Sequence, residues 1–188
     1  MPRVKLFDQE EAVSRAMELF WEKGYESTSL SDLTAHLGIG KGSFYATFGS
    51  KEQLFQRCIE KYTEASLPFL DIALDADADL PVALQKLLES YVEGLMNDDK
   101  RRGCFMANSC ALVNTQGPGI DKIINAHYQR IERYLSRSMA QRGVDPSRAQ
   151  GVSALIITFL IGMSQQSKIN RDKAAYLSTV KQIVSLLG

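Results

Sequence analysis

Residues 38–52 read GIGKGSFYATFGSKE, and three glycines, a lysine and a serine fall within the first six positions. A phosphate-binding loop of the Walker type requires the spacing G-x-x-x-x-G-K-[ST] after a strand. Here Lys41 is followed by glycine, and Ala35 stands where the first glycine of that motif would be. The dinucleotide pattern G-x-G-x-x-G also fails, because its last position is Ser43. The stretch instead predicts a glycine-containing turn that leads into a short helix at about 41–48.

The segments on both sides of this turn are predicted to be helices. Asp8 can cap a first helix with an apolar stripe, and Gly24 is a natural left-handed stop for it. Ser29 can cap a second helix of about two turns that ends at Gly38, and Ser50 can cap a fourth helix. A helix, a tight turn and a second short helix form a helix-turn-helix, which presents the second helix to a DNA groove.

The stretch 19–55, LFWEKGYESTSLSDLTAHLGIGKGSFYATFGSKEQLF, resembles the DNA-binding domain of the TetR family of bacterial repressors. The shared features include the LF-x-x-x-G-[YF] end of the first helix, the G-S-[FL]-Y recognition helix and F-x-S-K-E. A weaker similarity covers 101–112, RRGCFMANSCAL. The resemblance implies an all-α protein of about nine helices. Its expected parts are a three-helix DNA-binding domain at 1–50 and a helical ligand-binding and dimerisation domain at 51–188.

The recognition helix and its surroundings supply donors for phosphates and base edges. The residues predicted to contact DNA are Thr28, Ser29, Lys41, Gly42, Ser43, Tyr45, Thr47 and Lys51. The roles of Thr28, Ser29 and Lys51 as phosphate contacts follow from the resemblance, but Ser29 is expected to be a helix cap first and a DNA contact second. Phe44 and Phe48 lie four residues apart on the opposite side of the helix and are expected in the core.

The charge balance argues against a strongly basic DNA-binding surface. The chain has 22 Lys and Arg against 22 Asp and Glu, and residues 1–51 carry six positive and seven negative side chains. Most of these acids lie on the first helix. The region 28–51 contains two basic residues, Lys41 and Lys51, and a single acidic one, Asp32. Arg3 and Lys5 form a short basic arm. We therefore expect modest non-specific affinity and reliance on neutral donors.

Other functional classes find little support in the composition. The N-terminal residues contain no apolar secretion signal, and the apolar run Val152–Met163 is shorter than the roughly 18 residues of a membrane span. Three cysteines without CxxC spacing and two distant histidines do not indicate a metal site. We expect a cytoplasmic protein with reduced thiols, no metal, no cofactor and no membrane partner.

The C-terminal helices suggest a homodimer. The helix predicted at 146–168 is apolar nearly all round, so it needs packing partners on every side. Covering it with the same helix pair from a second chain gives an intermolecular four-helix bundle, as the resemblance also implies. The predicted interface residues are Leu155, Phe159, Leu160, Met163, Tyr176, Val180, Ile183 and Val184.

The resemblance places a pocket for a small-molecule inducer among helices four to eight. The candidates are Tyr62, Phe69, Tyr91, Cys104, Asn108, His127, Tyr128 and Gln165. Core packing is the simpler explanation for the aromatic residues and for His127. Cys104 follows Lys100, Arg101 and Arg102, which can lower the pKa of a nearby thiol, so an electrophile-sensing role stands beside that of a structural thiol.

Two other classes of protein remain as alternatives to a repressor released from a double-stranded operator by an inducer. A Cys- or Lys-dependent transferase is one, but no nucleophile–base pair with a recognisable local context is present. A helical protein-interaction adaptor is the other. Binding to double-stranded DNA selected from random sequences separates the regulator from both.

Overall fold

The computed structural model describes the backbone of residues 8–73, 79–112 and 118–185, and the side chains of 8–66, 79–112 and 119–185. These residues form nine α-helices and one 3-10 turn, and none of them lies in a strand, so the predicted all-α fold is confirmed. The helices are α1 Gln9–Lys23, α2 Leu30–Leu37, α3 Lys41–Phe48, α4 Lys51–Ala73, α5 Leu80–Met96, α6 Phe105–Ser109, α7 Pro118–Gln141, α8 Pro146–Gln166 and α9 Lys173–Ser185, with the 3-10 turn η1 at Cys110–Leu112.

Local capping sets the boundaries of the first helices. The Asp8 carboxylate accepts hydrogen bonds from the backbone N–H groups of Glu10 and Glu11, and so caps α1. Ser29 and Asp32 form a reciprocal capping box at the start of α2. Gly38 ends α2 in the left-handed conformation, with φ 71° and ψ 32°, which turns the chain toward α3.

A first apolar core holds the helix-turn-helix together and continues into the rest of the chain. Phe20 of α1, Leu33 of α2 and Phe44 of α3 are fully or almost fully buried against α4. Burial of Phe44 and Phe48 confirms that this side of α3 faces the interior. The same core includes Phe105 of α6 and Ile120 of α7, so it runs across residue 50. A domain boundary at that position stays a prediction.

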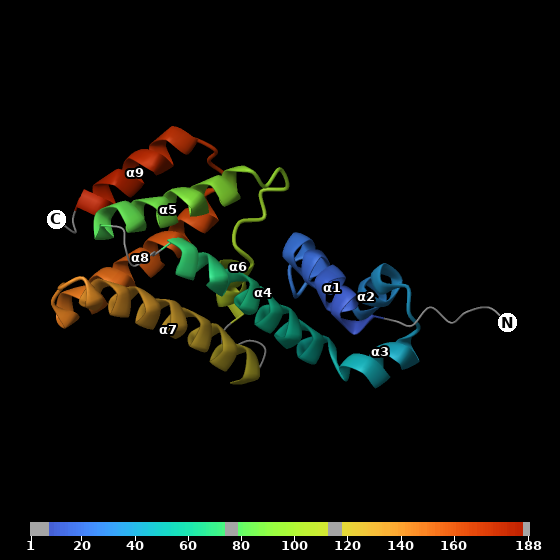
Figure 1. Ribbon diagram of the computed structural model, residues 1–188. Coiled ribbons are helices and arrows are strands. Elements are labelled where there is room, and N and C mark those ends of the chain that lie inside the picture. The colour runs from blue at the N-terminus through green and yellow to red at the C-terminus, as the bar shows by residue number, and fades with distance from the viewer. Residues whose placement is uncertain (1–7, 74–78, 113–117, 186–188) are drawn as a thin grey trace.

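The remaining helices form a second core at the far end of the molecule (Figure 1). Helix α7 packs along α8, and α5 packs along α9. Figure 1 shows α1, α2 and α3 gathered at one end, α5 and α9 at the other, and α4 running between the two groups. Helix α4 starts beside α3 and continues to the second core. A shift of the helices around the second core can therefore be transmitted through α4 to the helix-turn-helix.

The predicted dimer interface needs correction, because α5 covers much of it. Met163, Tyr176, Val180 and Val184 are at most 7% exposed and belong to the chain's own second core. We withdraw these four residues from the interface. The opposite side of α8 remains open within one chain, where Leu155 is 45% exposed and Phe159 is half-buried. Leu160 of α8 and Ile183 of α9, which belong to the same prediction, are also half-buried.

Candidate DNA-binding surface and ligand cavity

One side of α3 is open to solvent. Lys41, Gly42, Ser43 and Tyr45 are exposed, and Tyr45 is 53% exposed. Thr47 is half-buried. The Tyr45 ring packs edge-on against the buried Phe44 ring, with centroids 5.8 Å apart, and its exposed part offers a ring surface and a hydroxyl to a partner. Figure 1 shows α3 at the outer end of the molecule, where a DNA duplex has access to it.

The beginning of α3 differs from the beginning of α2. Gly40 is the N-cap of α3 and supplies no side-chain cap, whereas the Ser29 hydroxyl accepts a hydrogen bond from the Asp32 N–H in the first turn of α2. The N-terminus of a helix carries free N–H donors and a partial positive charge, which suit a phosphate oxygen. An alanine Cβ at Gly42 would meet nothing within 4 Å, so glycine there is not required by packing within the chain.

The two hydroxyl residues before α2 have opposite environments. Thr28 is fully buried, and its hydroxyl donates a hydrogen bond of 2.7 Å to the carbonyl oxygen of Gly24. We therefore withdraw Thr28 from the predicted DNA contacts. Ser29 is exposed, but its Oγ accepts from the Asp32 N–H at 3.1 Å. Its capping role is present in the structure, and a DNA contact through Ser29 stays a prediction.

Lys51 stands at the start of α4 and has an unusual neighbour. Its ammonium nitrogen lies 4.1 Å from the centre of the Tyr25 ring, in cation–π contact. Partial burial lowers the pKa of Lys51, and the nearby carboxylate of Glu26 opposes that shift. The side chain is thus held close to the turn between α1 and α2. To bind a phosphate, the Lys51 ammonium must either move away from the Tyr25 ring or contact the ring and the phosphate at the same time.

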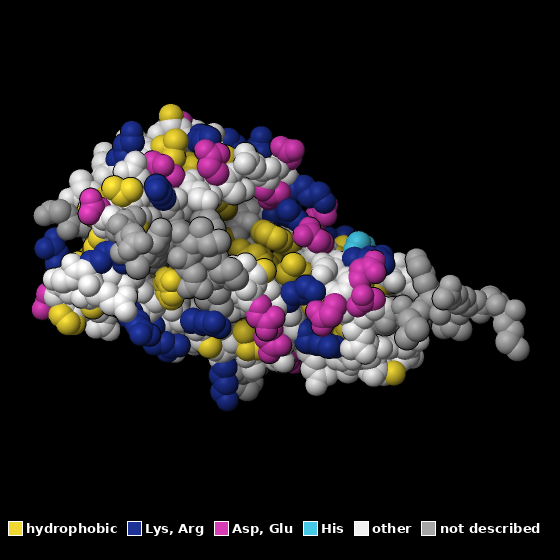
Figure 2. All heavy atoms as spheres, in the orientation of Figure 1, with side chains coloured by type: hydrophobic (Ala, Val, Ile, Leu, Met, Phe, Trp, Pro, Cys, Tyr) yellow, Lys and Arg dark blue, Asp and Glu magenta, His cyan; other side chains and the backbone are white. Residues whose placement is uncertain are grey.

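The surface charge at this end is mixed, as the composition predicts. Figure 2 shows Lys and Arg side chains interspersed with Asp and Glu on the face in view. Lys23 pairs with Asp32 at 2.8 Å, and hydrogen bonds from Lys23 and then from Ser29 hold the pKa of that carboxyl far below its usual range. The basic arm predicted at Arg3 and Lys5 lies outside the described residues.

A cavity of about 100 Å³ lies inside the body, between α4, α5, α6, α7 and α8, and we call it the interior cavity. Its lining residues are Tyr62, Ser66, Leu87, Tyr91, Cys104, Ala107, His127, Tyr128, Ile131, Leu160 and Ile161. Five of them were among the eight candidates from the sequence. A more open hollow of about 490 Å³ shares Tyr62, Ser66, Tyr91 and Cys104 with it, and reaches Trp21 of α1.

Tyr62, Tyr91 and His127 of the interior cavity are uncharged near neutral pH. The Tyr62 hydroxyl and the Cys104 thiol are 3.2 Å apart, and the Tyr91 hydroxyl donates to the Leu160 carbonyl oxygen at 3.2 Å. Burial raises the pKa of both tyrosines. Burial, and next the charge of Arg130, lower the pKa of His127 to about 4, so its ring is neutral. Such a site suits an uncharged, mostly apolar molecule.

Two candidates with described side chains, Asn108 and Gln165, do not line the interior cavity. Asn108 joins elements together: its Nδ2 donates to the Arg102 carbonyl oxygen at 2.8 Å, and its Oδ1 accepts from Lys168 at 2.5 Å. Gln165 donates to the same Oδ1 at 3.2 Å. Both residues are thus engaged in tying α6 to α8, and we withdraw them from the predicted cavity. The side chain of Phe69 lies outside the described residues.

Two of the three basic residues before Cys104 are paired with carboxylates of α1. Lys100 pairs with Glu22 at 2.8 Å, and Arg102 pairs with Glu18 at 2.5 Å. The expected effect of these cations on the thiol therefore has no support in their contacts. Among the described residues, no group of three His, Cys, Asp or Glu side chains lies close enough together to hold a metal ion.

Two family models match the chain. Residues 12–58 match the bacterial regulatory proteins of the tetR family, and residues 81–182 match the C-terminal domain of LmrA/YxaF-like transcriptional regulators. The chain is 33% identical to the HTH-type transcriptional repressor BdcR of Escherichia coli over 168 residues, which is 88% of this chain and 82% of that protein. The repressor ComR of the same organism is 31% identical over 74% of this chain and 67% of its own length. The chain therefore belongs to the TetR family of bacterial regulatory proteins.

Solved structures agree with this assignment over the whole length. A cysteine mutant of the TetR-family regulator CifR, complexed with a 26-bp double-strand operator DNA, superposes with a TM-score of 0.82 at 26% identity. It covers 99% of this chain and 100% of its own. A TetR regulator from Legionella pneumophila has a TM-score of 0.83 at 18% identity, covering 100% and 99%, and shares the fold. The chain is a TetR-family transcriptional regulator.

Proposed function

We propose that this TetR-family repressor binds a palindromic operator as a homodimer in the cytoplasm, and that a small molecule in the interior cavity releases it. The regulator has no catalytic role in this proposal. Each protomer places one α3 in the major groove of one half-site, and the two half-sites lie about 34–36 Å apart. Phosphate contacts provide most of the affinity, and base edges provide the preference for one sequence.

The exposed side of α3 is the observation that carries the proposal. Lys41, Ser43 and Tyr45 project donors and a ring into solvent, while Phe44 and Phe48 fix the opposite side in the core. An eight-residue helix is too short to be stable alone. The buried rings of Phe44 and Phe48 therefore hold α3 in place, so its exposed side chains have the fixed positions that hydrogen bonding to base edges requires.

Selection of double-stranded DNA from a random library, followed by gel-shift titration, tests this function. We expect enrichment of an inverted repeat whose half-sites are one helical turn apart. The triple variant Lys41→Ala, Tyr45→Ala, Lys51→Ala should fold like the wild type by circular dichroism and lose binding to the enriched sequence. Unchanged operator affinity in that folded variant would place the DNA-binding surface elsewhere.

The neutral, mostly apolar lining of the interior cavity supports an uncharged inducer. Residues from α4 and α6 meet in it, and α4 begins with Lys51 beside the recognition helix. A ligand that fits only one of two α4 positions shifts the dimer toward that position, and the separation of the two α3 helices changes with it. A library of neutral aromatic compounds, tested for release of the selected operator, checks this. Filling the cavity by Ile161→Phe should abolish release and keep DNA binding.

Covalent modification of Cys104 is a second candidate for the signal. Its Sγ lines the interior cavity beside the Tyr62 hydroxyl. With an α,β-unsaturated aldehyde, the sulfur bonds to the β-carbon, the thiol proton passes to the α-carbon, and no group leaves. If such an aldehyde releases the wild type from DNA and not Cys104→Ser, with the matching mass increase on Cys104, the thiol is the sensor. An equal response of both proteins assigns Cys104 to the core.

A further inference from the structure

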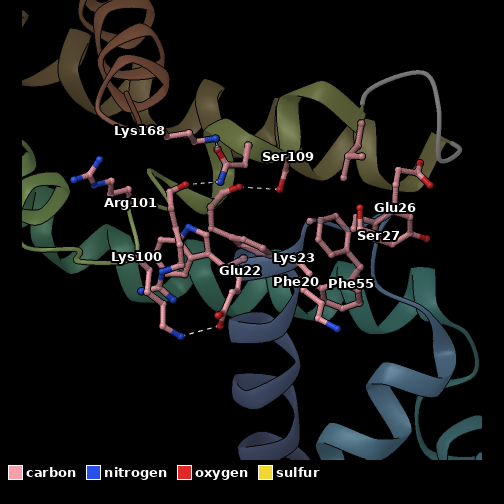
Figure 3. A pocket seen from close by; sticks show the side chains of 17 residues that line it. Phe20, Glu22, Lys23, Glu26, Ser27, Phe55, Lys100, Arg101, Ser109 and Lys168 are labelled. Carbon is pink, nitrogen blue, oxygen red and sulfur yellow. Dashed lines mark hydrogen bonds and ion pairs between the residues drawn. The ribbon is translucent and has the colours of Figure 1, made fainter. Parts of the chain in front are cut away.

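A groove of about 410 Å³ lies where the turn between α1 and α2 meets the start of α6, and we call it the junction groove. Its lining comes from Phe20 to Ser27, Phe55, Lys100 to Arg102, the α6–η1 segment and Lys168. None of these residues lines the interior cavity. Figure 3 shows Lys168 on one side of the groove and the Lys100–Glu22 pair on the other. The groove is therefore a separate space between the DNA-binding end and the body.

The lining combines aromatic rings with an excess of positive charge. Phe20, Tyr25, Phe55 and Phe105 form the floor of the groove; they are at most 8% exposed and pack on one another at centroid distances of 4.7–5.8 Å. The charged side chains in the lining are five basic ones, Lys23, Lys100, Arg101, Arg102 and Lys168, against the two acidic ones Glu22 and Glu26. Apolar surface beside a net positive charge suits an anion that carries a flat ring.

Two of these cations have no carboxylate partner in the part of the chain that the structure describes. Lys168 donates to the neutral Asn108 amide oxygen at 2.5 Å, and Arg101 forms none of the ion pairs found there. Partial burial lowers the pKa of Lys168, so an incoming anion would offset part of its lost hydration. Arg101 also adopts a left-handed φ of 54°, which is uncommon outside glycine.

The groove is linked to the DNA-binding surface through one ring. Tyr25 lines the groove and also carries the Lys51 ammonium 4.1 Å from its ring centre. Trp21, the single tryptophan of the sequence, lines the same groove and donates its indole N–H to the Gly103 carbonyl oxygen at 3.0 Å. A ligand that stacks in the groove thus contacts α1 and the side chain that positions Lys51.

We propose that the junction groove is a second ligand site, which takes a small organic anion with a flat apolar ring, of the arenecarboxylate class. Its occupancy weakens DNA binding by displacing Tyr25 and, with it, Lys51. The binding half of the proposal is independent of the proposed function. The regulatory half rests on that function, because it requires an operator.

Calorimetric titration of the full chain with 2-naphthoate tests the binding half. We expect one site per chain and at least tenfold weaker binding of 2-naphthamide, which keeps the rings and lacks the charge. Lys168→Met removes the ammonium and keeps most of the stem, and Arg101→Gly removes the guanidinium and suits the left-handed φ. Each should weaken 2-naphthoate binding about tenfold. Arg133→Ala, an exposed arginine on α7, is the matched control and should leave it unchanged.

Binding of 2-naphthoate in the interior cavity, and not in the junction groove, is the alternative that the same variants test. If 2-naphthoate binds there instead, Ile161→Phe will abolish binding and the two junction-groove variants will leave it unchanged. That pattern overturns the proposal, as does the absence of wild-type binding at millimolar 2-naphthoate. Equal affinity for 2-naphthoate and 2-naphthamide would also overturn it, and this comparison needs no variant to fold.

Gel shifts with the selected operator test the regulatory half. Saturating 2-naphthoate should lower operator affinity at least fivefold for the wild type, and Lys168→Met should need about tenfold more 2-naphthoate to reach half of that loss. Binding in the groove with unchanged operator affinity would overturn the coupling through Tyr25 and Lys51. Failure to find any operator would count against the proposed function, while the calorimetry would still decide whether the groove binds anions.

Discussion

Thr28 and Ser29 show how far two adjacent hydroxyl groups can differ in role. The sequence places both before a helix, and local capping rules apply to both equally well. Tertiary packing decides between them: Thr28 is fully buried and bonded to Gly24, whereas Ser29 is exposed and caps α2. The burial of a single residue depends on contacts with helices far along the chain, so it could not be predicted from the hydroxyl alone.

Replacing Thr28 with valine should separate stability from DNA binding. The substitution keeps the shape but removes the hydrogen bond to Gly24, which should lower the free energy of unfolding by about 1 kcal/mol in urea titrations. Operator affinity at 25 °C should not change. Ser43→Ala is the matched variant: its side chain is exposed, so stability should stay the same while affinity falls. A loss of DNA affinity in Thr28→Val without any loss of stability would restore Thr28 as a contact.

Protonation of His127 should destabilise the fold in mild acid. Its pKa is about 4 when folded, below the ordinary value of about 6.5 in an unfolded chain, because burial and then Arg130 disfavour the charged ring. The stability from the neutral ring is therefore fully present above pH 6.5 and is lost as the pH falls toward 4. The loss is at most about 3 kcal/mol, at 1.36 kcal/mol per pKa unit. Urea titrations of His127→Gln should show a flatter dependence over this interval. Identical profiles would exclude His127 as the cause.

At the scale of elements, the helix-turn-helix was predictable almost residue by residue. The caps Asp8 and Ser29, the left-handed stop at Gly38 and the spacing of Phe44 and Phe48 all act within one or two turns, and the structure agrees with them. Gly24 ends α1 as predicted, but with φ 82° and ψ 156° instead of the left-handed helical conformation. The interior cavity was only partly predictable, since five of the eight candidates line it. Asn108 and Gln165 failed because they bond to each other between α6 and α8, a contact that local periodicity cannot indicate.

Gly42 offers a test of whether α3 is built for contact with DNA. A Cβ at this position meets nothing in the free chain, and alanine favours a helix interior over glycine by roughly 0.5–1 kcal/mol. Gly42→Ala should therefore raise the urea midpoint. It should also weaken operator binding, because the added methyl group separates the helix backbone from the groove. If the variant is more stable and binds equally well, the backbone at Gly42 does not approach DNA closely.

At the scale of the whole molecule, α8 explains why the sequence predicts a dimer but could not indicate which residues would form its contacts. An apolar helix needs cover on all sides, and this composition is visible in the sequence. The side that a partner can cover depends on where α5 and α9 pack. Their packing buries four of the predicted interface residues in the chain's own core, namely Met163, Tyr176, Val180 and Val184. The side that stays open exposes Gly151, Leu155, Thr158 and Gly162, spaced along one side of α8. Small residues there let a second helix approach closely.

Leu155→Glu should therefore separate the protomers without unfolding them. Leu155 is 45% exposed in one chain, so a carboxylate is tolerated there in a monomer but must be desolvated in a dimer interface. Light scattering at micromolar concentration should give the mass of one chain for the variant and of two for the wild type. Operator affinity should fall about a hundredfold, because two linked half-site contacts become two independent weak ones.

Val82→Glu is the matched control for this experiment, since Val82 on α5 is 46% exposed and lies outside the proposed interface. It should remain dimeric and bind the operator normally, which shows that a new charge on an apolar surface is not itself the cause. A wild-type monomer at micromolar concentration would contradict the dimer directly. A dimeric Leu155→Glu variant with full affinity would move the interface away from the open side of α8.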